Sequence, residues 1–192
     1  MVVSEREREF GPEVLEACRR GDREAFRVVY EAYKDRVYSL AFYALGGDRS
    51  AASDITQQVF VKLLTSLSQF RGDARLSTWL HRLVVNLCLD GRRAAQRRPA
   101  VSDPSLLDAL VDPRSPHHEL AIAERADAVQ RALSQLPPRF RMVILLRYFE
   151  DRSYEDIAAA LNCSIGTVAS RLNRAHRALA KLLAPVHAGG GR

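Results

Sequence analysis

Apolar residues recur at three- and four-residue steps along most of this chain, and strand-like alternation is nearly absent. That period places apolar side chains on one face of an α-helix. The first such helix is predicted from about Asp22 to Leu45, and it ends at Gly46 and Gly47 because glycine is favoured just past a helix end. Its apolar face comprises Phe26, Val29, Tyr30, Tyr33, Val37 and Leu40.

Two more amphipathic helices are predicted before residue 98. The first has Ile55, Val59, Phe60, Leu63 and Leu67 on its apolar side. Gly72 and Asp73 interrupt the chain, and the next helix presents Leu76, Trp79, Leu80, Leu83 and Leu87. The pattern therefore predicts an all-α fold.

Residues 99–118 differ in kind, because they contain four prolines and show little sustained apolar period. That composition is typical of a linker between two domains. Residues 101–118 can reach at most ~60 Å at ~3.3 Å per residue, so two small helical domains can occupy separate stretches of one long ligand. A helix from Leu120 to Leu136 follows. Pro137 and Pro138 separate it from a helix carrying Phe140, Val143, Ile144 and Tyr148.

The stretch from Ser153 to Leu183 is predicted to form a helix-turn-helix. Ser153 is placed to cap the first helix, with Asp156 as a weak capping-box partner. Asn162 and Cys163 form the turn, and Ser164 can cap the second helix. A buried stripe on that helix is formed by Ile165, Val168, Leu172, Ala175, Leu179 and Leu182.

The opposite face of the second helix is polar and basic. It carries Thr167, Ser170, Arg171, Asn173, Arg174 and Arg177. Short polar side chains interspersed with arginines suit the reading of base edges in a DNA major groove. A surface helix that is merely charged stays open as the alternative, because short motifs match often by chance.

Composition supports a nucleic-acid partner and excludes several other classes. The net charge of +6 and the pI near 9.6 suit a polyanion. No apolar run approaches the roughly 20 residues of a membrane helix. Residues 1–10 contain alternating Glu and Arg at positions 5–9, which makes this segment too charged for a secretory signal. A cytoplasmic protein without membrane insertion is expected.

No feature of the sequence predicts an enzyme, a cofactor or a metal site. Cys18, Cys88 and Cys163 are odd in number and widely spaced, which predicts buried or partly buried thiols in a reducing compartment. His117 and His118 are adjacent and point apart on a helix, so they are interpreted as a polar pair at the linker end. There is no P-loop and no local signature of a nucleophile with its base. No catalytic residue is therefore expected.

Two sequence blocks, in this order, resemble bacterial sigma factors of the extracytoplasmic-function type. The first contains Asp54-Ile-Thr-Gln-Gln-Val-Phe60, Phe70-Arg-Gly-Asp73, Ser77-Thr-Trp-Leu80 and Asn86. The second contains Leu136-Pro-Pro-Arg-Phe-Arg141, Ser153-Tyr-Glu-Asp-Ile-Ala158 and Gly166-Thr-Val-Ala-Ser-Arg-Leu-Asn-Arg-Ala175. The resemblance covers about residues 12 to 185.

The resemblance implies two functional domains between short tails at 1–11 and 186–192. A region 2 domain over 12–98 would bind the clamp of core RNA polymerase and would recognise and open the minus-10 element. After the linker at 99–118, a region 4 domain over 119–185 would read the minus-35 element. The implied partners are core RNA polymerase, promoter DNA and a cognate anti-sigma factor.

The resemblance also implies roles for individual residues. The polymerase-binding helix would use Asp54, Gln57, Gln58 and Phe60, although the family commonly has glutamate where Gln58 stands and Phe60 also has core-compatible spacing. Minus-10 DNA would be contacted by Arg71, Arg75, Trp79, Arg82, Asn86, Arg92 and Arg93. Minus-35 DNA would be contacted by Thr167, Ser170, Arg171, Asn173 and Arg174.

The minus-10 set has a physical rationale and two alternatives. Opening DNA requires a pocket for an unstacked base and cations along the single strand. On helical spacing alone a place in the core is favoured for Trp79, because tryptophan buries much surface. Arg92, Arg93, Arg97 and Arg98 form a basic run that can also be a solvated helix end favoured by the helix dipole.

Two other functional classes remain open from the residues alone. A two-domain DNA-binding repressor or activator would share the helix-turn-helix but would not need the Asp54–Phe60 block. A module that only sequesters protein partners would not need the arginines of the last helix. Transcription in vitro with purified core polymerase separates all three classes.

Overall fold

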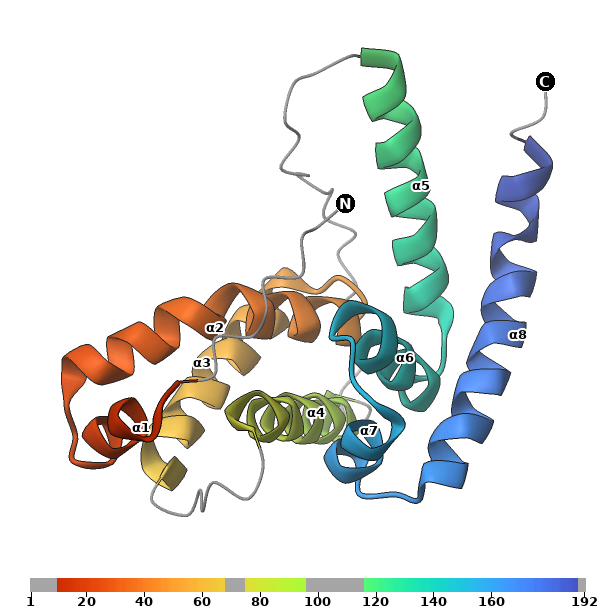
Figure 1. The fold of residues 1–192 in the computed structure, drawn as a ribbon. Helices are drawn as coiled ribbons and strands as arrows, with labels where there is room; N and C mark the ends of the chain where they lie inside the picture. Colours follow the sequence, from red (N-terminus) through yellow and green to blue (C-terminus); the bar gives the residue numbers. More distant parts are fainter. Residues whose placement is uncertain (1–9, 68–74, 96–115, 190–192) are drawn as a thin grey trace.

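The computed structural model describes residues 10–67, 75–95 and 116–189. The helices before the linker are α1 (Pro12–Arg19), α2 (Arg23–Ala44), α3 (Arg49–Ser66) and α4 (Leu76–Ala95). After it come α5 (Pro116–Gln135), α6 (Pro138–Ile144), the π-helical segment η2 (Leu145–Phe149), α7 (Tyr154–Leu161) and α8 (Ile165–Gly189). These residues hold helices and no strand, which confirms the all-α prediction (Figure 1).

Capping residues set the ends of α2 and α3. The Asp22 carboxylate accepts from the backbone N–H groups of Glu24 and Ala25 at 2.9 and 3.1 Å, and Asp48 accepts from Ala51 at 2.9 Å. Gly46 and Gly47, at φ of +82° and +96°, make the turn between the helices. The predicted helix from Asp22 to Leu45 is therefore confirmed. Asp22 is its N-cap and Leu45 is its C-cap.

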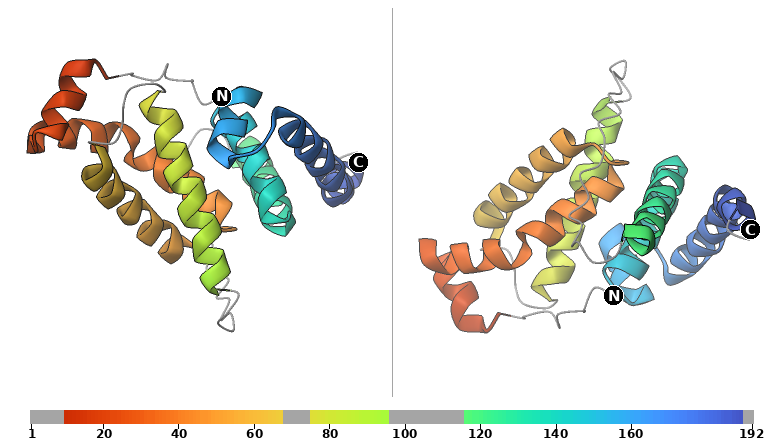
Figure 2. Two further views of the ribbon diagram at one scale, coloured as in Figure 1. Left: turned by 90° about the horizontal axis from the view of Figure 1, so that it is seen from below. Right: turned by 90° about the horizontal axis from the view of Figure 1, so that it is seen from above.

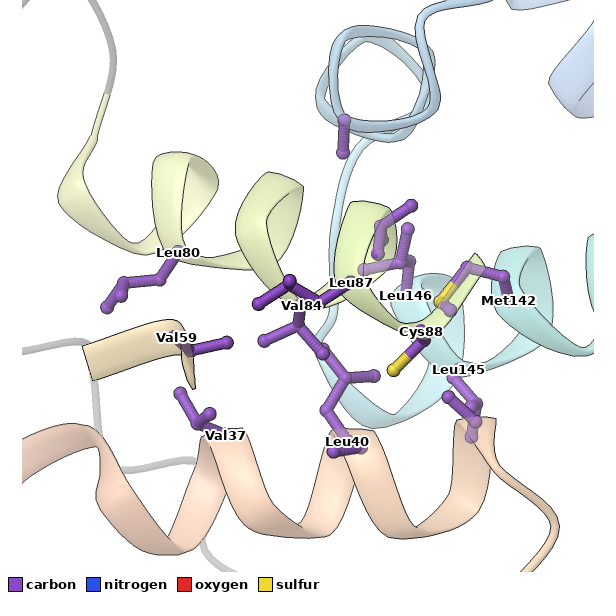
Figure 3. Packing of buried hydrophobic residues seen from close by; sticks show 14 of the residues in the cluster. Val37, Leu40, Val59, Leu80, Val84, Leu87, Cys88, Met142, Leu145 and Leu146 are labelled. Carbon is purple, nitrogen blue, oxygen red and sulfur yellow. The ribbon is translucent and has the colours of Figure 1, made fainter. Parts of the chain in front are cut away.

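Helix α4 lies between the α2–α3 pair and the C-terminal helices (Figure 2). On one side it packs Leu80 and Val84 against Val37 and Leu40 of α2 and Val59 of α3 (Figure 3). All of the apolar positions predicted for α3 are buried. Tyr30 of α2 is a departure from the predicted apolar face, because it is 37% exposed.

The C-terminal half departs from the predicted pattern in two places. Helix α5 begins at Pro116, so residues 116–118, expected in the linker, are helical. Proline suits the first position of a helix, where its missing N–H costs no hydrogen bond. Tyr148, expected on an apolar face, is 60% exposed. It lies in η2, where the wider turn shifts the apolar face to Leu145 and Leu146.

The two halves of the chain share one hydrophobic core. Leu87 and Cys88 of α4 lie beside Met142, Leu145 and Leu146 of α6 and η2 (Figure 3). Each of these five side chains is at most 7% exposed. The proline-rich composition of residues 99–115 indicates two domains but gives no sign of this shared core.

Arg141 of α6 is the largest fully buried side chain, at 1% exposed, and it links both halves. Its Nη1 donates to the Ala44 carbonyl at the end of α2 at 2.9 Å. Its other nitrogens donate to carbonyls at the end of α5, namely Leu133 at 2.7 Å, Leu136 at 3.1 Å and Ser134. These carbonyls lie where helices end, and Leu133 is the one that also accepts from a backbone N–H, that of Leu136 at 3.1 Å. Carbonyls at helix ends lack intrahelical donors, so one guanidinium satisfies several buried acceptors.

Replacing Arg141 with methionine should lower the free energy of unfolding by about 2–4 kcal/mol, because buried carbonyls would lose their donors. Urea denaturation followed by circular dichroism measures this change. The control is Arg139→Met, which removes an exposed arginine from the same helix. Equal stability of the two variants would contradict the role given to Arg141.

Candidate nucleic-acid and protein interfaces

The helix-turn-helix forms as the capping residues predict. Ser153 Oγ accepts from the backbone N–H of Asp156 at 3.0 Å, and Ser164 Oγ accepts from that of Thr167 at 3.2 Å. The Asp156 carboxylate accepts from the Ser153 hydroxyl at 3.0 Å. The capping-box partner therefore bonds the side chain of Ser153, whereas in a standard capping box it bonds the backbone N–H of that residue. Asn162 ends α7 in the left-handed conformation, at φ +47° and ψ +55°. Asparagine tolerates this conformation better than most residues.

Helix α8 has one buried and one outward side. Val168, Leu172 and Ala175 are buried as predicted, and Leu179 and Leu182 pack partly against the core. Ile165, predicted to be buried with them, is 48% exposed because it begins the helix. The outward side carries the five residues predicted for minus-35 DNA, which we call the α8 face: Thr167, Ser170, Arg171, Asn173 and Arg174.

Contacts within the motif orient several members of the α8 face. Thr167 Oγ1 lies 2.9 Å from Ser164 Oγ, and Ser170 Oγ donates to the Thr167 carbonyl at 3.0 Å. Arg171 is half-buried, and its Nη1 lies 3.8 Å from Cys163 Sγ in the turn. Arg174 is exposed. The two arginines therefore differ: Arg171 lies back along the turn, and Arg174 projects from the helix.

Helix α4 carries a second outward strip, the α4 face, formed by Arg75, Trp79, Arg82 and Asn86. Steps of four, three and four residues place these positions on one side of a helix. Arg75, Arg82 and Asn86 are exposed, and Trp79 is half-buried and packs against the core. Part of Trp79 therefore supports the core, and part of it reaches the surface. Arg71 and the side chains of Arg92, Arg93, Arg97 and Arg98 lie outside the described residues.

A third strip lies on α3, where Asp54, Gln57 and Gln58 are exposed on one side of the helix. The same side continues through Val61 and Leu64, which are 62% and 60% exposed. We call these five residues the α3 stripe. Exposed apolar side chains beside polar ones are typical of a protein interface. The sequence analysis did not include Val61 and Leu64 in the candidate site. Both are apolar but lie off the apolar face predicted for this helix, and that position was the signal that could have identified them.

Phe60 lies beneath the α3 stripe. It is 5% exposed, and its ring meets that of Tyr30 edge-on with the centroids 4.7 Å apart. Edge-to-face geometry is favourable for aromatic pairs. Phe60 therefore fixes α3 against α2 from the inside, while its polar neighbours Asp54, Gln57 and Gln58 face solvent.

A cluster of polar side chains that the sequence did not reveal joins α2, α4 and the end of η2, with Glu150 and His81 buried and Arg36 half-buried. Glu150 is 5% exposed, and its Oε2 lies 2.5 Å from Arg36 Nε and 2.9 Å from His81 Nε2. A carboxylate only accepts hydrogen bonds, so His81 carries a proton on Nε2. We call Arg36, His81 and Glu150 the Glu150 cluster. Its acid comes from the C-terminal half, and both of its donors come from the N-terminal half.

The cysteines are the remaining candidate reactive groups. The three cysteines are free, with Cys88 buried and Cys18 and Cys163 half-buried, as predicted. Burial, together with the carboxylate of Asp22, raises the pKa of the Cys18 thiol and disfavours the reactive thiolate. The described residues contain no group of three potential metal ligands. None of the described helices has the length and apolar character to cross a membrane.

Comparison with known proteins matches both halves of the chain. Residues 29–98 match the model of sigma-70 region 2, and residues 126–182 match that of sigma-70 region 4. RNA polymerase sigma-H factor of Pseudomonas aeruginosa is 35% identical over 182 residues, which are 91% of this chain and 94% of that protein. The ECF RNA polymerase sigma-E factor of Escherichia coli K12 is 34% identical over 90% of this chain and 94% of its own length.

Solved structures show the same arrangement of helices. The sigma factor RpoE of Bartonella quintana, in complex with the anti-sigma factor NepR, is 25% identical, with a TM-score of 0.65 over 83% of this chain and 97% of that one. CnrH, in complex with the cytosolic domain of CnrY, is 23% identical, with a TM-score of 0.65 over 90% of this chain and 96% of that one, and it supports the fold.

Proposed function

This chain belongs to the extracytoplasmic-function (ECF) sigma factors of bacterial RNA polymerase, and we propose that three of its surfaces divide the work of promoter recognition. As a sigma factor, the chain binds core RNA polymerase and directs transcription initiation at specific promoters. The proposal assigns core binding to the α3 stripe, minus-10 DNA to the α4 face and minus-35 DNA to the α8 face. The separation of these three outward strips on three helices is the observation that carries it.

The α3 stripe suits a protein partner. It combines one carboxylate and two amides with two exposed aliphatic side chains. Interfaces of this kind bury an apolar centre inside a polar rim. Phe60 supports the stripe from below. A DNA-binding repressor would not need a polymerase-binding surface of this kind, so the α3 stripe favours a sigma factor over a repressor.

The α4 face suits single-stranded DNA. Arg75 and Arg82 supply cations for the backbone, and Trp79 and Asn86 offer an aromatic surface and an amide for an unstacked base. The α8 face suits duplex DNA, since helix-turn-helix proteins place the second helix in the major groove. We assign residues 12–98 to the region 2 domain and residues 119–185 to the region 4 domain.

We further propose control by an anti-sigma factor and a cytoplasmic site of action, with no enzymatic role. A solved relative bound to an anti-sigma factor supports the first proposal. Run-off transcription with purified core polymerase on fragmented genomic DNA tests the central function. Specific transcripts that require this chain are expected, and a chain that blocks but never starts transcription would instead be a repressor.

Reversing the charge of Asp54 should weaken binding to core polymerase by at least about tenfold, because opposite charges complement one another across interfaces. Fluorescence titration of labelled protein with core enzyme measures the affinity. Asp35→Lys makes the same change at an exposed position on α2 and should bind normally. Equal affinity of the two variants would remove the α3 stripe from the interface.

Replacing Asn86 or Arg75 with alanine should impair promoter opening more than binding to closed duplex, because single-strand contacts form only after melting. Permanganate reactivity of unpaired thymines, on a promoter obtained from the run-off experiment, measures opening. Arg27→Ala, a change at an exposed arginine of α2, is the control. Wild-type reactivity in both test variants would contradict the role of the α4 face.

We expect at least one of Arg171 and Arg174 to contact a base. Loss of a bidentate contact to guanine should cost about 1–3 kcal/mol and relax the preference at one base pair. A phosphate contact would instead weaken all sequences alike and lower the salt slope by about one unit. The affinity of each alanine variant for a series of DNA duplexes with altered minus-35 sequences distinguishes the two kinds of contact. Lys181→Ala, at an exposed position further along α8, is the control. Uniform weakening in both series would refute base reading by these arginines.

A further inference from the structure

We propose that the surface for minus-35 DNA extends beyond the α8 face to a pair of side chains, Tyr148 of η2 and His176 of α8, and that this pair binds a phosphate of the duplex backbone. This inference rests on the proposed function of the α8 face. It adds a contact that does not depend on base sequence and that helps to fix how α8 lies in the groove.

The pair joins two helical segments at the surface. Tyr148 Oη lies 2.8 Å from His176 Nε2, within hydrogen-bond distance, and the two rings are tilted with their centroids 5.6 Å apart. Both side chains are exposed, Tyr148 to 60%. A hydrogen bond at the surface contributes little to folding, because water offers the same groups good partners. The pair is therefore available to a ligand at little cost to the fold.

The π-helical geometry of η2 explains how Tyr148 reaches this position. The first two leucines of η2 lie in the core, and the two aromatic residues at its end diverge. The ring of Phe149 lies 5.2 Å from that of Tyr43 on α2, whereas Tyr148 meets His176 on α8. π-Helical segments occur frequently at functional sites. Here the segment brings a phenol hydroxyl beside the second helix of the helix-turn-helix.

The protons of the pair leave one hydrogen-bond donor for an outside acceptor. A phenol carries one O–H, and a neutral imidazole carries one N–H. If Tyr148 donates to His176 Nε2, the imidazole proton is on Nδ1 and takes no part in the bond between the two rings. If Nε2–H donates to the phenol oxygen, the Tyr148 O–H remains. In both arrangements one donor is left, and a phosphate oxygen accepts from such side chains.

The pair lies beside the α8 face. His176 follows Asn173 by three residues, so the two side chains are neighbours on the helix surface. Arg174 and Arg177 are exposed on the adjoining side and make the surroundings positive. Within the described part of the chain, neither Tyr148 nor His176 contacts a carboxylate. The charge therefore favours an anion, and phosphates flank a recognition helix that occupies the major groove.

Holoenzyme that carries Tyr148→Phe or His176→Ala tests this contact on a duplex with the minus-35 element of a promoter from the run-off experiment. Each variant should bind the duplex about three- to tenfold more weakly than wild type, as expected for the loss of one hydrogen bond. The loss should be the same for every minus-35 sequence, because a phosphate contact carries no base preference. Tyr38→Phe, which removes a hydroxyl from α2, is the control and should match wild type.

Methylphosphonate substitution, which removes the charge and one acceptor oxygen from a single phosphate, locates the contact. Substitutions made one at a time along both strands should reveal one phosphate at which wild type loses affinity and the two variants lose no more. At the other phosphates, wild type and variants should lose affinity equally, because independent contacts are additive. Variants with wild-type affinity, or variants as sensitive as wild type to every substitution, would overturn the proposal.

Further measurements separate this inference from the proposed function. Circular dichroism and thermal melting verify folding, and His176→Gln, which keeps an N–H donor, should recover part of the affinity lost by His176→Ala. If wild-type holoenzyme does not distinguish the minus-35 element from other DNA, the role of the α8 face is contradicted and this inference falls with it. If that recognition is intact but the Tyr148 and His176 variants lose affinity for core polymerase and not for DNA, the exposed ring serves a protein partner and this inference alone is wrong.

Discussion

The buried guanidinium of Arg141 is the interaction on which this arrangement of helices depends. A planar group with five N–H donors reaches the ends of two helices at once, which no apolar side chain can do. It satisfies Ala44 at the end of α2 and three carbonyls around the end of α5. The turn at Gly46 and Gly47 comes next along the chain. The absence of a side chain on Gly46 leaves room for the Arg141 guanidinium, since a Cβ there would lie 3.1 Å from Arg141 Nη1. The N-terminal half is thereby fixed to α6. Because η2 and the helix-turn-helix continue the chain from α6, this contact also helps to position them.

Local patterns predicted the helices and much of the candidate site. Capping residues such as Asp22, Ser153 and Ser164 act within three residues of their partners, so the sequence is sufficient to identify them. The same holds for the outward positions of α8 and α3, because a helical period specifies which residues share a side. Tyr148 was placed wrongly because a π-turn changes that period, and Ile165 because it stands at a helix start.

Features that depend on distant residues could not be predicted in this way. Glu150 is 114 residues from Arg36 and 69 from His81, and no period connects them. The burial of Arg141 could not be predicted either, because its acceptors are backbone carbonyls, which every sequence contains. The proline-rich segment correctly suggested two functional units, but composition says nothing about whether the units pack together. The shared core around Leu87, Cys88 and Met142 was invisible for the same reason.

The division of the Glu150 cluster between the halves limits how modular this protein is. Sigma factor domains with separate DNA targets invite exchange, in which a region 4 from one relative is fused to a region 2 from another. Here such a chimera would place a foreign residue opposite Arg36 and His81, which both bond the Glu150 carboxylate. Grafts that carry an acid at position 150 would keep an acceptor for Arg36 and His81. Those that do not would leave these two side chains without their acceptor and would weaken the contact between the two halves.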